Sequence, residues 1–198
     1  MLGTHREYIS LLREELRSIE RESEGSELPL KKLRLMDSFL RETARLNPLD
    51  GLNTQRMALK DFTFSDGSYI PAGNLVAVPQ HAVLRDERNY RDPDCFDGHR
   101  FYTPEVDVDS TASTKYTDVK WEYPYWGSPN HACPGRWYAS DLQKLTLVHI
   151  LKNYDFEISD PRTSSKPFTW TTALLSRFSA KITFWPLEEA GSGQLKPC

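Results

Sequence analysis

Residues 125–136 read YWGSPNHACPGR and place a single cysteine, Cys133, between turn-forming residues just ahead of a helical pattern. Gly127 and Gly135 permit backbone conformations that a side chain would block, and Pro134 suits the first turn of a helix. A thiolate at Cys133 would lie near the positive end of the following helix dipole, which favours a soft metal ligand. A free, inert core cysteine fits the same spacing. The pattern alone therefore leaves both a functional and a structural Cys133 open.

Three helical patterns surround this stretch. The spacing predicts an amphipathic helix over 5–22, a second over 30–46 and a third over 137–153. Pro48 ends the second helix, because it pushes Asn47 out of helical geometry. The expected inward positions of the three helices are Tyr8, Ile9, Leu12, Leu16 and Ile19; Leu33, Met36, Phe39, Leu40 and Thr43; and Leu142, Leu145, Val148 and Leu151.

Short strands are predicted between and after these helices. They cover 54–59, 62–64, 74–78, 154–158 and 177–185, and the last alternates apolar and polar residues. Residues 85–123 are rich in Asp, Pro, Ser and Thr and show little periodicity, so we expect an irregular segment of functional importance. No strand–helix–strand alternation supports a parallel sheet, and the predicted class is therefore α+β.

Net charge, aromatic content and cysteine spacing exclude several classes of function. The 198 residues carry a net charge of −3, too weak to suggest a nucleic-acid partner or a polybasic membrane surface. Aromatic residues make up 12% of the chain, which indicates a real core. The three cysteines are far apart, so neither a disulfide framework nor a zinc knuckle is expected. We expect one domain over 1–187 and a flexible tail over 188–198.

Two further motifs accompany the cysteine stretch. Glu42 and Arg45 are three residues apart in the second helix and lie on one face of it. Residues 96–101 read FDGHRF and supply Arg100. Taken singly, the first is usually a surface ion pair worth less than about 1 kcal/mol, and the second is an ordinary turn. Their order and separation relative to Cys133 make a coincidence improbable.

Together these motifs resemble the cytochrome P450 superfamily. The cysteine stretch is similar to its haem-binding loop, Glu42 and Arg45 to its ExxR motif, and 96–101 to its FxPxRF segment. Pro129 departs from the loop motif, which has its second glycine there. The resemblance implies the C-terminal part of that fold, on the proximal side of the haem. It is mostly helical with short β-sheets, and it begins in the J-helix region. In amino-acid sequence, these motifs resemble those of filamentous-fungal members most.

The resemblance assigns roles residue by residue. Cys133 would be the proximal thiolate ligand of the iron of haem b, and Arg56 would pair with a haem propionate. His131 would contact a propionate as well, although a solvent-facing loop histidine fits it equally. Glu42, Arg45 and Arg100 would form a buried ion network that supports the haem pocket. Segments 49–55 and 171–175 match loops that line the substrate pocket, while core or turn residues remain nearly as good an interpretation.

The same resemblance implies a reaction. A member of this family is a monooxygenase that inserts one oxygen atom from O2 into a small lipophilic substrate, such as a terpenoid or another secondary metabolite. Its electrons would come from NADPH through a flavoprotein reductase that docks on the proximal face. Arg136 and Lys144 would contribute a weak basic patch near that face, although ordinary solvated charges fit them as well. Full-length members imply the endoplasmic reticulum membrane. We expect no anchor in this stretch, so the chain would be cytosolic if expressed as it is.

Two other interpretations stay open. The chain resembles the proximal half of the pocket without the distal helices, so it could be a truncated, non-catalytic relic or an interaction module. Alternatively it could be a thiol enzyme with Cys133 as the nucleophile and His131 or His149 as the base, provided that the base reaches the sulfur.

Overall fold

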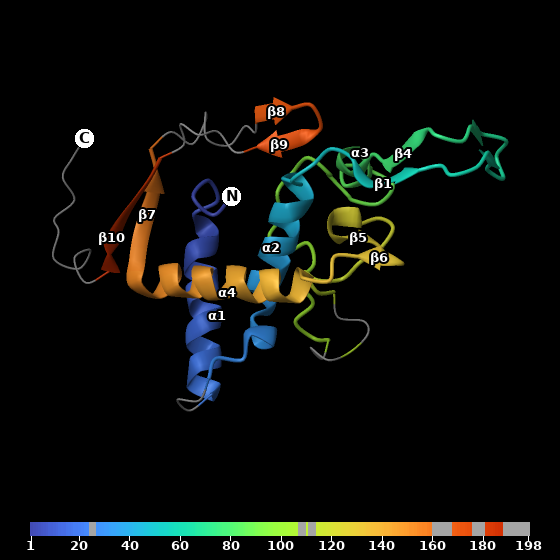
Figure 1. Cartoon of the computed structure of the whole chain (residues 1–198). Helices are drawn as coiled ribbons and strands as arrows, with labels where there is room; N and C mark the ends of the chain where they lie inside the picture. Colours follow the sequence, from blue (N-terminus) through green and yellow to red (C-terminus); the bar gives the residue numbers. More distant parts are fainter. Residues whose placement is uncertain (24–26, 107–109, 111–113, 160–167, 176–180, 188–198) are drawn as a thin grey trace.

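The computed structural model describes residues 1–23, 27–106, 110, 114–159, 168–175 and 181–187. Three main helices form its centre: α1 (Glu7–Glu22), α2 (Arg34–Leu46) and α4 (Arg136–Asn153). Figure 1 shows α4 crossing α1 and α2, with small β-hairpins arranged around the three helices. The predicted α+β class with short sheets is confirmed.

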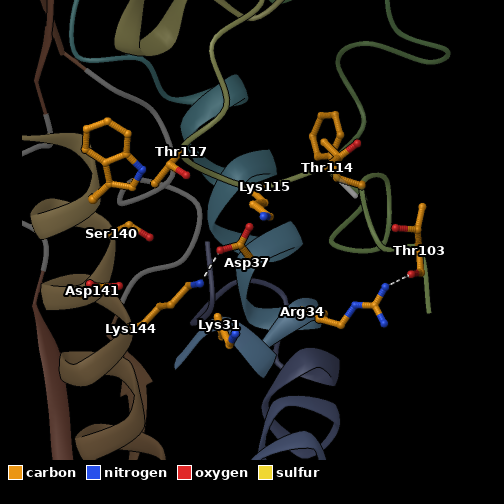
Figure 2. Close-up of a pocket in the computed structure, with 12 residues that line it drawn as sticks. Lys31, Arg34, Asp37, Thr103, Thr114, Lys115, Thr117, Ser140, Asp141 and Lys144 are labelled. Carbon is orange, nitrogen blue, oxygen red and sulfur yellow. Dashed lines mark hydrogen bonds and ion pairs between the residues drawn. The ribbon is translucent and has the colours of Figure 1, made fainter. Parts of the chain in front are cut away.

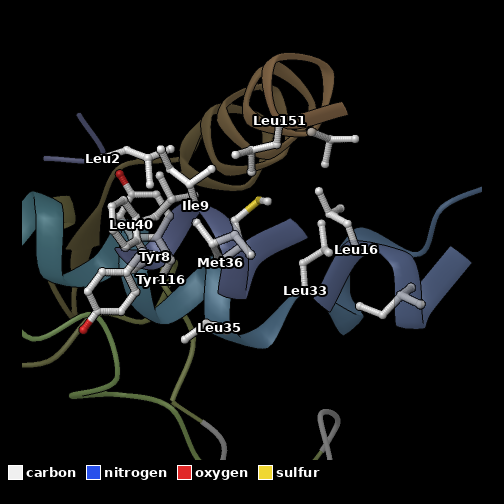
Figure 3. Packing of buried hydrophobic residues seen from close by; sticks show 14 of the residues in the cluster. Leu2, Tyr8, Ile9, Leu16, Leu33, Leu35, Met36, Leu40, Tyr116 and Leu151 are labelled. Atoms are coloured by element: carbon white, nitrogen blue, oxygen red, sulfur yellow. The ribbon is translucent and has the colours of Figure 1, made fainter. Parts of the chain in front are cut away.

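The core lies where the three helices meet. The buried face of α1 consists of the five predicted residues, Tyr8, Ile9, Leu12, Leu16 and Ile19. Figure 3 shows Met36 of α2 lying between side chains of α1 and Leu151 of α4. Fully burying a side chain of this size stabilises the fold by about 1.5–3 kcal/mol, so this contact fixes how the helices sit together.

The second predicted helix is divided in two. A short 3-10 helix, η1 (Leu30–Lys32), precedes α2, and Leu33 between them has ψ 74°, outside the helical region. The predicted continuous helix over 30–46 is therefore wrong at its start. Leu33 is the N-cap residue of α2, and its side chain has no atom that could accept a hydrogen bond from the free N–H groups of the first turn. The Glu15 carboxylate of α1 accepts those of Leu35 and Met36, at 2.6 and 3.0 Å. One helix thus caps the other.

Helix α4 differs from its prediction in the face that it buries. Val148 and Leu151 are buried, but Leu142 and Leu145 are about half exposed, with 51% and 52% of their surface accessible. Ser140 and Lys144 lie in the core in their place. Apolar residues occur on more than one side of this helix, so periodicity could not identify the inner face.

Within the described residues, the strands form five antiparallel pairs. Two pairs make one protruding arm, β1 (Asn53–Met57) with β4 (Leu75–Val78) and β2 (Phe62–Thr63) with β3 (Tyr69–Ile70). The others are β5 (Gly127–Ser128) with β6 (His131–Ala132), β7 (Tyr154–Ile158) with β10 (Ile182–Pro186), and β8 (Phe168–Trp170) with β9 (Ala173–Leu175). The prediction over 154–158 matches β7. Of the strand predicted over 177–185, residues 177–180 lie outside the described residues, and β10 covers most of the rest.

An irregular segment follows the short helix α3 (Gln80–Val83). Between 84 and 123, the described residues form turns and one isolated bridge, Lys120 to Tyr123, but no helix or strand. The irregular segment predicted over 85–123 is thus confirmed for these residues. A short 3-10 helix, η2 (Pro124–Trp126), leads from it into the cysteine stretch. None of the helices in the described ranges has the length and apolar character needed to cross a membrane.

Candidate cofactor site

The cysteine stretch folds as a tight hairpin. Strands β5 and β6 pair Gly127 with Ala132 and Ser128 with His131, leaving Pro129 and Asn130 as a two-residue turn. Gly127 has φ 104°, and a Cβ at this position would lie 2.5 Å from the His131 carbonyl oxygen. Only glycine fits such a conformation without strain. The proline that departs from the family motif therefore lies at the tip of the turn, where no ladder N–H is required of it.

Backbone bonds on both sides hold Cys133. Its N–H donates to the Trp126 carbonyl at 2.7 Å, and its own carbonyl accepts from Nη1 of Arg136 at 2.8 Å. The Arg136 guanidinium also donates to the Thr117 carbonyl and lies over the Trp137 ring, 3.5 Å from its centroid. Cys133 itself is exposed, three residues ahead of the first residue of α4. The exposed thiol is therefore held just before a helix N-terminus.

A pocket of about 520 Å³ lies between this loop and β1. It brings Arg56 of β1 together with His131 of β6 and Cys133 just after it, and the sequence singled out all three. Arg56 is exposed, and its Nη1 donates to the Gln55 carbonyl at 2.7 Å, the one hydrogen bond recorded for its guanidinium among the described residues. The pocket thus offers a soft sulfur donor and a cation that can bind a carboxylate in bidentate fashion.

Thr54 in the wall of this pocket adopts an unusual conformation. Its φ is 51°, in the left-handed region that a β-branched residue rarely occupies. Its hydroxyl is buried and has no hydrogen-bond partner within the described residues. A strained residue with an unsatisfied polar atom is typical of a ligand site. Leu52 and Trp126 add apolar and aromatic wall, so the residues present fit a flat, metal-containing group that carries carboxylates, such as haem.

The two segments expected to line a substrate pocket lie side by side. Gly51 donates its N–H to the Thr172 carbonyl at 2.6 Å, and Leu174 donates to the Leu49 carbonyl at 3.0 Å. An isolated bridge joins Asp50 to Ala173 between these two bonds. Residues 49–50 and 52–55 border the pocket of Cys133, whereas 171–175 are bonded to 49–51 and are not among its lining residues.

Sequence reasoning missed the two amides that fix this edge of the pocket. Asn53 donates to Oε1 of Gln80 at 2.8 Å and to the Pro124 carbonyl at 2.5 Å. Gln80 is buried and donates to the Asp50 carbonyl at 2.9 Å. These bonds tie β1 to α3 and η2. No local pattern signals them, because each joins residues about 30 to 70 positions apart.

Glu42, Arg45 and Arg100 form one buried cluster. Arg45 holds the Glu42 carboxylate in bidentate fashion, at 2.7 and 2.8 Å, and both side chains are fully buried. Arg100 reaches Oε1 of the same carboxylate at 3.0 Å. The backbone N–H of Asp97 completes the acceptor set at 3.1 Å. One carboxylate therefore balances two guanidinium groups.

The two arginines of this cluster also bind the irregular segment. Arg45 donates to the carbonyls of Leu84 and Pro93, at 2.7 and 2.6 Å. Arg100 donates to the carbonyls of Arg91 and Cys95, at 2.6 and 3.0 Å. A segment without helix or strand must satisfy its backbone polar groups elsewhere, and guanidinium forks do so here. The cluster thus shapes the chain that leads into the cysteine loop.

Lys144 is a correction to the sequence reading. It was expected at a docking surface or as a solvated charge, but its side chain is buried and paired with Asp37, as Figure 2 shows. The backbone N–H of Tyr116 donates to the other oxygen of Asp37, at 2.5 Å. Lys144 therefore links α4 to α2 and is not available to a partner.

The two candidate bases for Cys133, His131 and His149, lie at different distances from it along the chain. His149 lies 13 positions after Arg136, at about 20 Å along α4 for a rise of about 1.5 Å per residue, and it contacts Asn153 and Tyr154 at the far end. Among the described residues, no hydrogen bond joins the sulfur of Cys133 to a histidine. His131 lies in the same pocket as Cys133 but is exposed. Within the described residues, neither His131 nor His149 is therefore hydrogen-bonded to Cys133.

Comparisons with known proteins agree with this geometry. Residues 1–184 match the family model described as Cytochrome P450. The chain is 40% identical over 184 residues to cytochrome P450 monooxygenase ltmQ of Epichloe festucae var. lolii, covering 91% of this chain and 34% of that protein. It is 38% identical over 174 residues to cytochrome P450 monooxygenase paxQ of Penicillium paxilli, covering 85% and 33%. The chain thus spans about a third of the length of these curated relatives.

Solved structures lead to the same family. The retinoic acid-bound cyanobacterial CYP120A1 superposes with a TM-score of 0.69 at 25% identity, over 94% of this chain and 40% of that one. A zebra fish cytochrome P450 studied with abiraterone gives a TM-score of 0.69 at 21% identity, over 93% and 42%, and shows the fold alone. Because the family model matches residues 1–184, most of this chain, the chain belongs to the cytochrome P450 family.

Proposed function

We propose that Cys133 is the thiolate ligand of a haem b iron and that this chain is the haem-binding part of a monooxygenase. The observation that carries the proposal is the pocket that joins an exposed, backbone-fixed Cys133 to Arg56 and His131. A thiolate ligand supplies electron density to the iron, which favours cleavage of the O–O bond of bound dioxygen. The net reaction places one oxygen atom in the substrate and the other in water.

The chain's own residues would hold the cofactor by charge and hydrogen bonding. Arg56 would bind a propionate, because an exposed guanidinium at the pocket can match a carboxylate with two parallel bonds. His131, exposed on the same hairpin, would donate a further bond to a propionate. Glu42, Arg45 and Arg100 would act at a distance, by holding the irregular segment that precedes the cysteine loop.

For the substrate we propose a small lipophilic molecule, such as a terpenoid or another secondary metabolite. The fungal relatives are named as monooxygenases, and Leu49 and Leu52 at the pocket edge are suited to apolar contact. The electrons would come from NADPH through a flavoprotein reductase. On the family resemblance alone, we place the reaction at the endoplasmic reticulum membrane.

The test is a reduced, carbon monoxide difference spectrum of the purified chain after addition of haem. We expect a strongly red-shifted Soret band, which Cys133→Ala abolishes. Cys95→Ala is the matched control, because Cys95 is also a free, exposed cysteine but does not border this pocket. A red-shifted band that survives in Cys133→Ala would exclude Cys133 as the ligand. An imidazole-type band, or no haem uptake, would favour a non-catalytic role for the chain.

A further inference from the structure

Strand β1 contains one residue more than its partner β4 between two paired positions. Asn53 lies opposite Val78 and Arg56 lies opposite Val76, so three steps along β1 match two steps along β4. An extra residue in one strand of an antiparallel pair is a β-bulge. Residues that lie opposite each other share a face of the sheet, and Val76 and Val78 lie on one face. Asn53 and Arg56 therefore lie on one face as well.

The bulge decides on which face of the strand Arg56 lies. In a regular strand, residues three positions apart lie on opposite faces, so Arg56 would lie on the face away from Asn53. Met57, the next residue, lies opposite Leu75 on that other face. The residues that line the pocket of Cys133 include Asn53 and Arg56 but not Met57. The bulge thus brings Arg56 to the face that borders the pocket.

Thr54 lies in the bulge in a conformation that it does not hold by itself. Its φ of 51° belongs to the left-handed region, which glycine usually fills in bulges of this kind. Its hydroxyl is buried and has no hydrogen-bond partner within the described residues, so the side chain of Thr54 does not fix the backbone. A neighbouring group has to stabilise this conformation.

The side chain of Asn53 stabilises it. Its Oδ1 accepts the N–H of Thr54 at 2.6 Å. Its Nδ2 donates to Oε1 of Gln80 at 2.8 Å and to the Pro124 carbonyl at 2.5 Å. Only this orientation of the amide satisfies all three bonds, because the oxygen can only accept and the nitrogen can only donate. Gln80 is itself buried and donates to the Asp50 carbonyl, so the amide of Asn53 is held firmly against the strained peptide.

The Pro124 carbonyl connects the bulge to the cysteine loop. It also accepts the N–H of Gly127, and the Trp126 carbonyl between them accepts the N–H of Cys133. A single amide, that of Asn53, therefore holds both the bulge and the turn that leads into the loop.

We infer that Asn53 is the positioning residue of the carboxylate-binding side of this pocket. By holding the bulge, it keeps Arg56 on the pocket face, where the guanidinium selects a ligand that carries carboxylates. A guanidinium binds a carboxylate in bidentate fashion only when the two groups face each other in one plane. The inference rests on the proposed function, since it takes haem with its two propionates as the ligand.

The test compares two ligands of the full chain, haem b and its dimethyl ester, in which both propionates are masked. Soret absorbance gives the two dissociation constants. We expect the native chain to prefer haem, and Asn53→Ala to reduce this preference about tenfold or more, as the loss of charge-assisted hydrogen bonds implies. Arg56→Gln should reduce it equally. The double variant should lose no more than either single variant, because both changes remove the same contact.

Three further variants separate positioning from general support of the fold. Thr54→Gly should restore the preference in the Asn53→Ala background, because glycine adopts the bulge conformation without strain. Gln80→Met removes one acceptor of Asn53 at similar volume. It should lower the preference several-fold, and it decides the matter if Asn53→Ala does not fold. Asn74→Ala removes an exposed amide just before β4 and should leave the preference unchanged.

A second readout needs no haem. A nitroxide is attached to Cys133 in a chain that carries Cys95→Ser and Cys198→Ser, and the NMR signal of the side-chain N–H of Arg56 is recorded. Paramagnetic broadening falls steeply with distance. We therefore expect this signal to be broadened in the native sequence and less so in Asn53→Ala, relative to the backbone amide of Arg56.

The outcomes separate this inference from the proposed function. Broadening or ligand preference that is unchanged in Asn53→Ala would overturn the inference. A double variant whose loss is the sum of the single losses would do so too, since Asn53 and Arg56 would then act independently. Haem bound through Cys133 without preference over the ester would overturn the inference and leave the proposed function intact. A native chain without the red-shifted band would contradict the proposed function, whereas reduced broadening in Asn53→Ala would still support the positioning of Arg56.

Discussion

At the scale of single residues, Glu42 is the carboxylate on which most of the buried polar structure depends. Its two oxygens accept from Arg45, Arg100 and the backbone of Asp97, and the side chain is fully buried. A buried ion pair adds little net stability relative to an apolar pair, because desolvation offsets the attraction. Breaking it is expensive, since the remaining charge stays in the core without a partner.

We therefore expect Glu42→Gln to lower the free energy of unfolding by about 3–5 kcal/mol, the usual cost of removing one member of a buried ion pair. Urea unfolding measures the effect. The matched control is Glu14→Gln, which loses exposed pairs with Arg17 and Arg21 and should cost less than about 1 kcal/mol. Equal losses in the two variants would show that the buried cluster does not stabilise the fold.

Sequence could place part of this cluster but not all of it. The three-residue spacing puts Glu42 and Arg45 on one helix face, and helical geometry alone accounts for their contact. The burial of Arg41 and Lys144 could not be predicted, because charged residues are almost always exposed unless paired. Tertiary contacts bury them. The rings of Phe101 and Tyr123 cover Arg41, and Asp37 on a neighbouring helix pairs with Lys144.

At the scale of elements, the N-terminus of α2 depends on α1. The Glu15 carboxylate accepts two of the free N–H groups of α2. Burial raises the pKa of Glu15 above its usual 4.5, and this effect outweighs the backbone bonds and Lys144, which lower it. The folded state therefore binds the Glu15 proton more tightly than the unfolded chain does.

This shift has a defined sign. Glu15 contributes its full stability below its unfolded pKa, and the contribution is lost as the pH rises through its raised folded pKa. The Glu15→Gln variant keeps one acceptor oxygen but does not titrate. We expect its free energy of unfolding to lack the decrease with rising pH that Glu15 causes in the native chain. Urea unfolding from pH 4 upward compares the two proteins. A difference between them that stays constant with pH, or that grows in favour of the native residue, would contradict the assignment.

Element prediction succeeded where periodicity was strong and failed where it was ambiguous. The α1 stripe identified all five buried residues. For α4 the bounds were accurate, but the inner face was wrong, because Leu142 and Leu145 are exposed and Ser140 and Lys144 are inside. The two-residue strands β5 and β6 were not predicted, since so short a pair has no alternation to detect. Their position is set by Gly127 and the turn after it.

At the scale of the whole molecule, the candidate pocket exists only because distant segments meet. Arg56 lies on β1, and Cys133 follows β6 more than 70 positions later. The bonds from Asn53 to Gln80 and Pro124 bring these parts together. Motifs predicted a ligand role for Cys133, but no local pattern could show that Thr54 would be strained and unsatisfied in the same pocket.

A ligand that binds this composite pocket should stabilise the whole fold. Haem that binds the native state alone adds RT ln(1 + [L]/Kd) to the free energy of unfolding, or about 2.7 kcal/mol at a hundredfold excess over Kd. We expect thermal unfolding to shift upward with haem in the native chain and by much less in Cys133→Ser, which lacks the soft donor. The Cys95→Ser variant should behave as the native chain does.

Hydrogen exchange locates this stabilisation. If haem binds between β1 and the cysteine hairpin, amides of 53–57 and 127–133 gain protection beyond the global increase. The β7–β10 pair, which borders a different part of α4, shows only the global increase. Haem also adheres to exposed apolar surface, and this chain exposes Leu142, Leu145 and Trp137. A thermal shift that persists in Cys133→Ser, with protection along α4 in place of the hairpin, would therefore assign the binding to that surface and remove the pocket as the haem site.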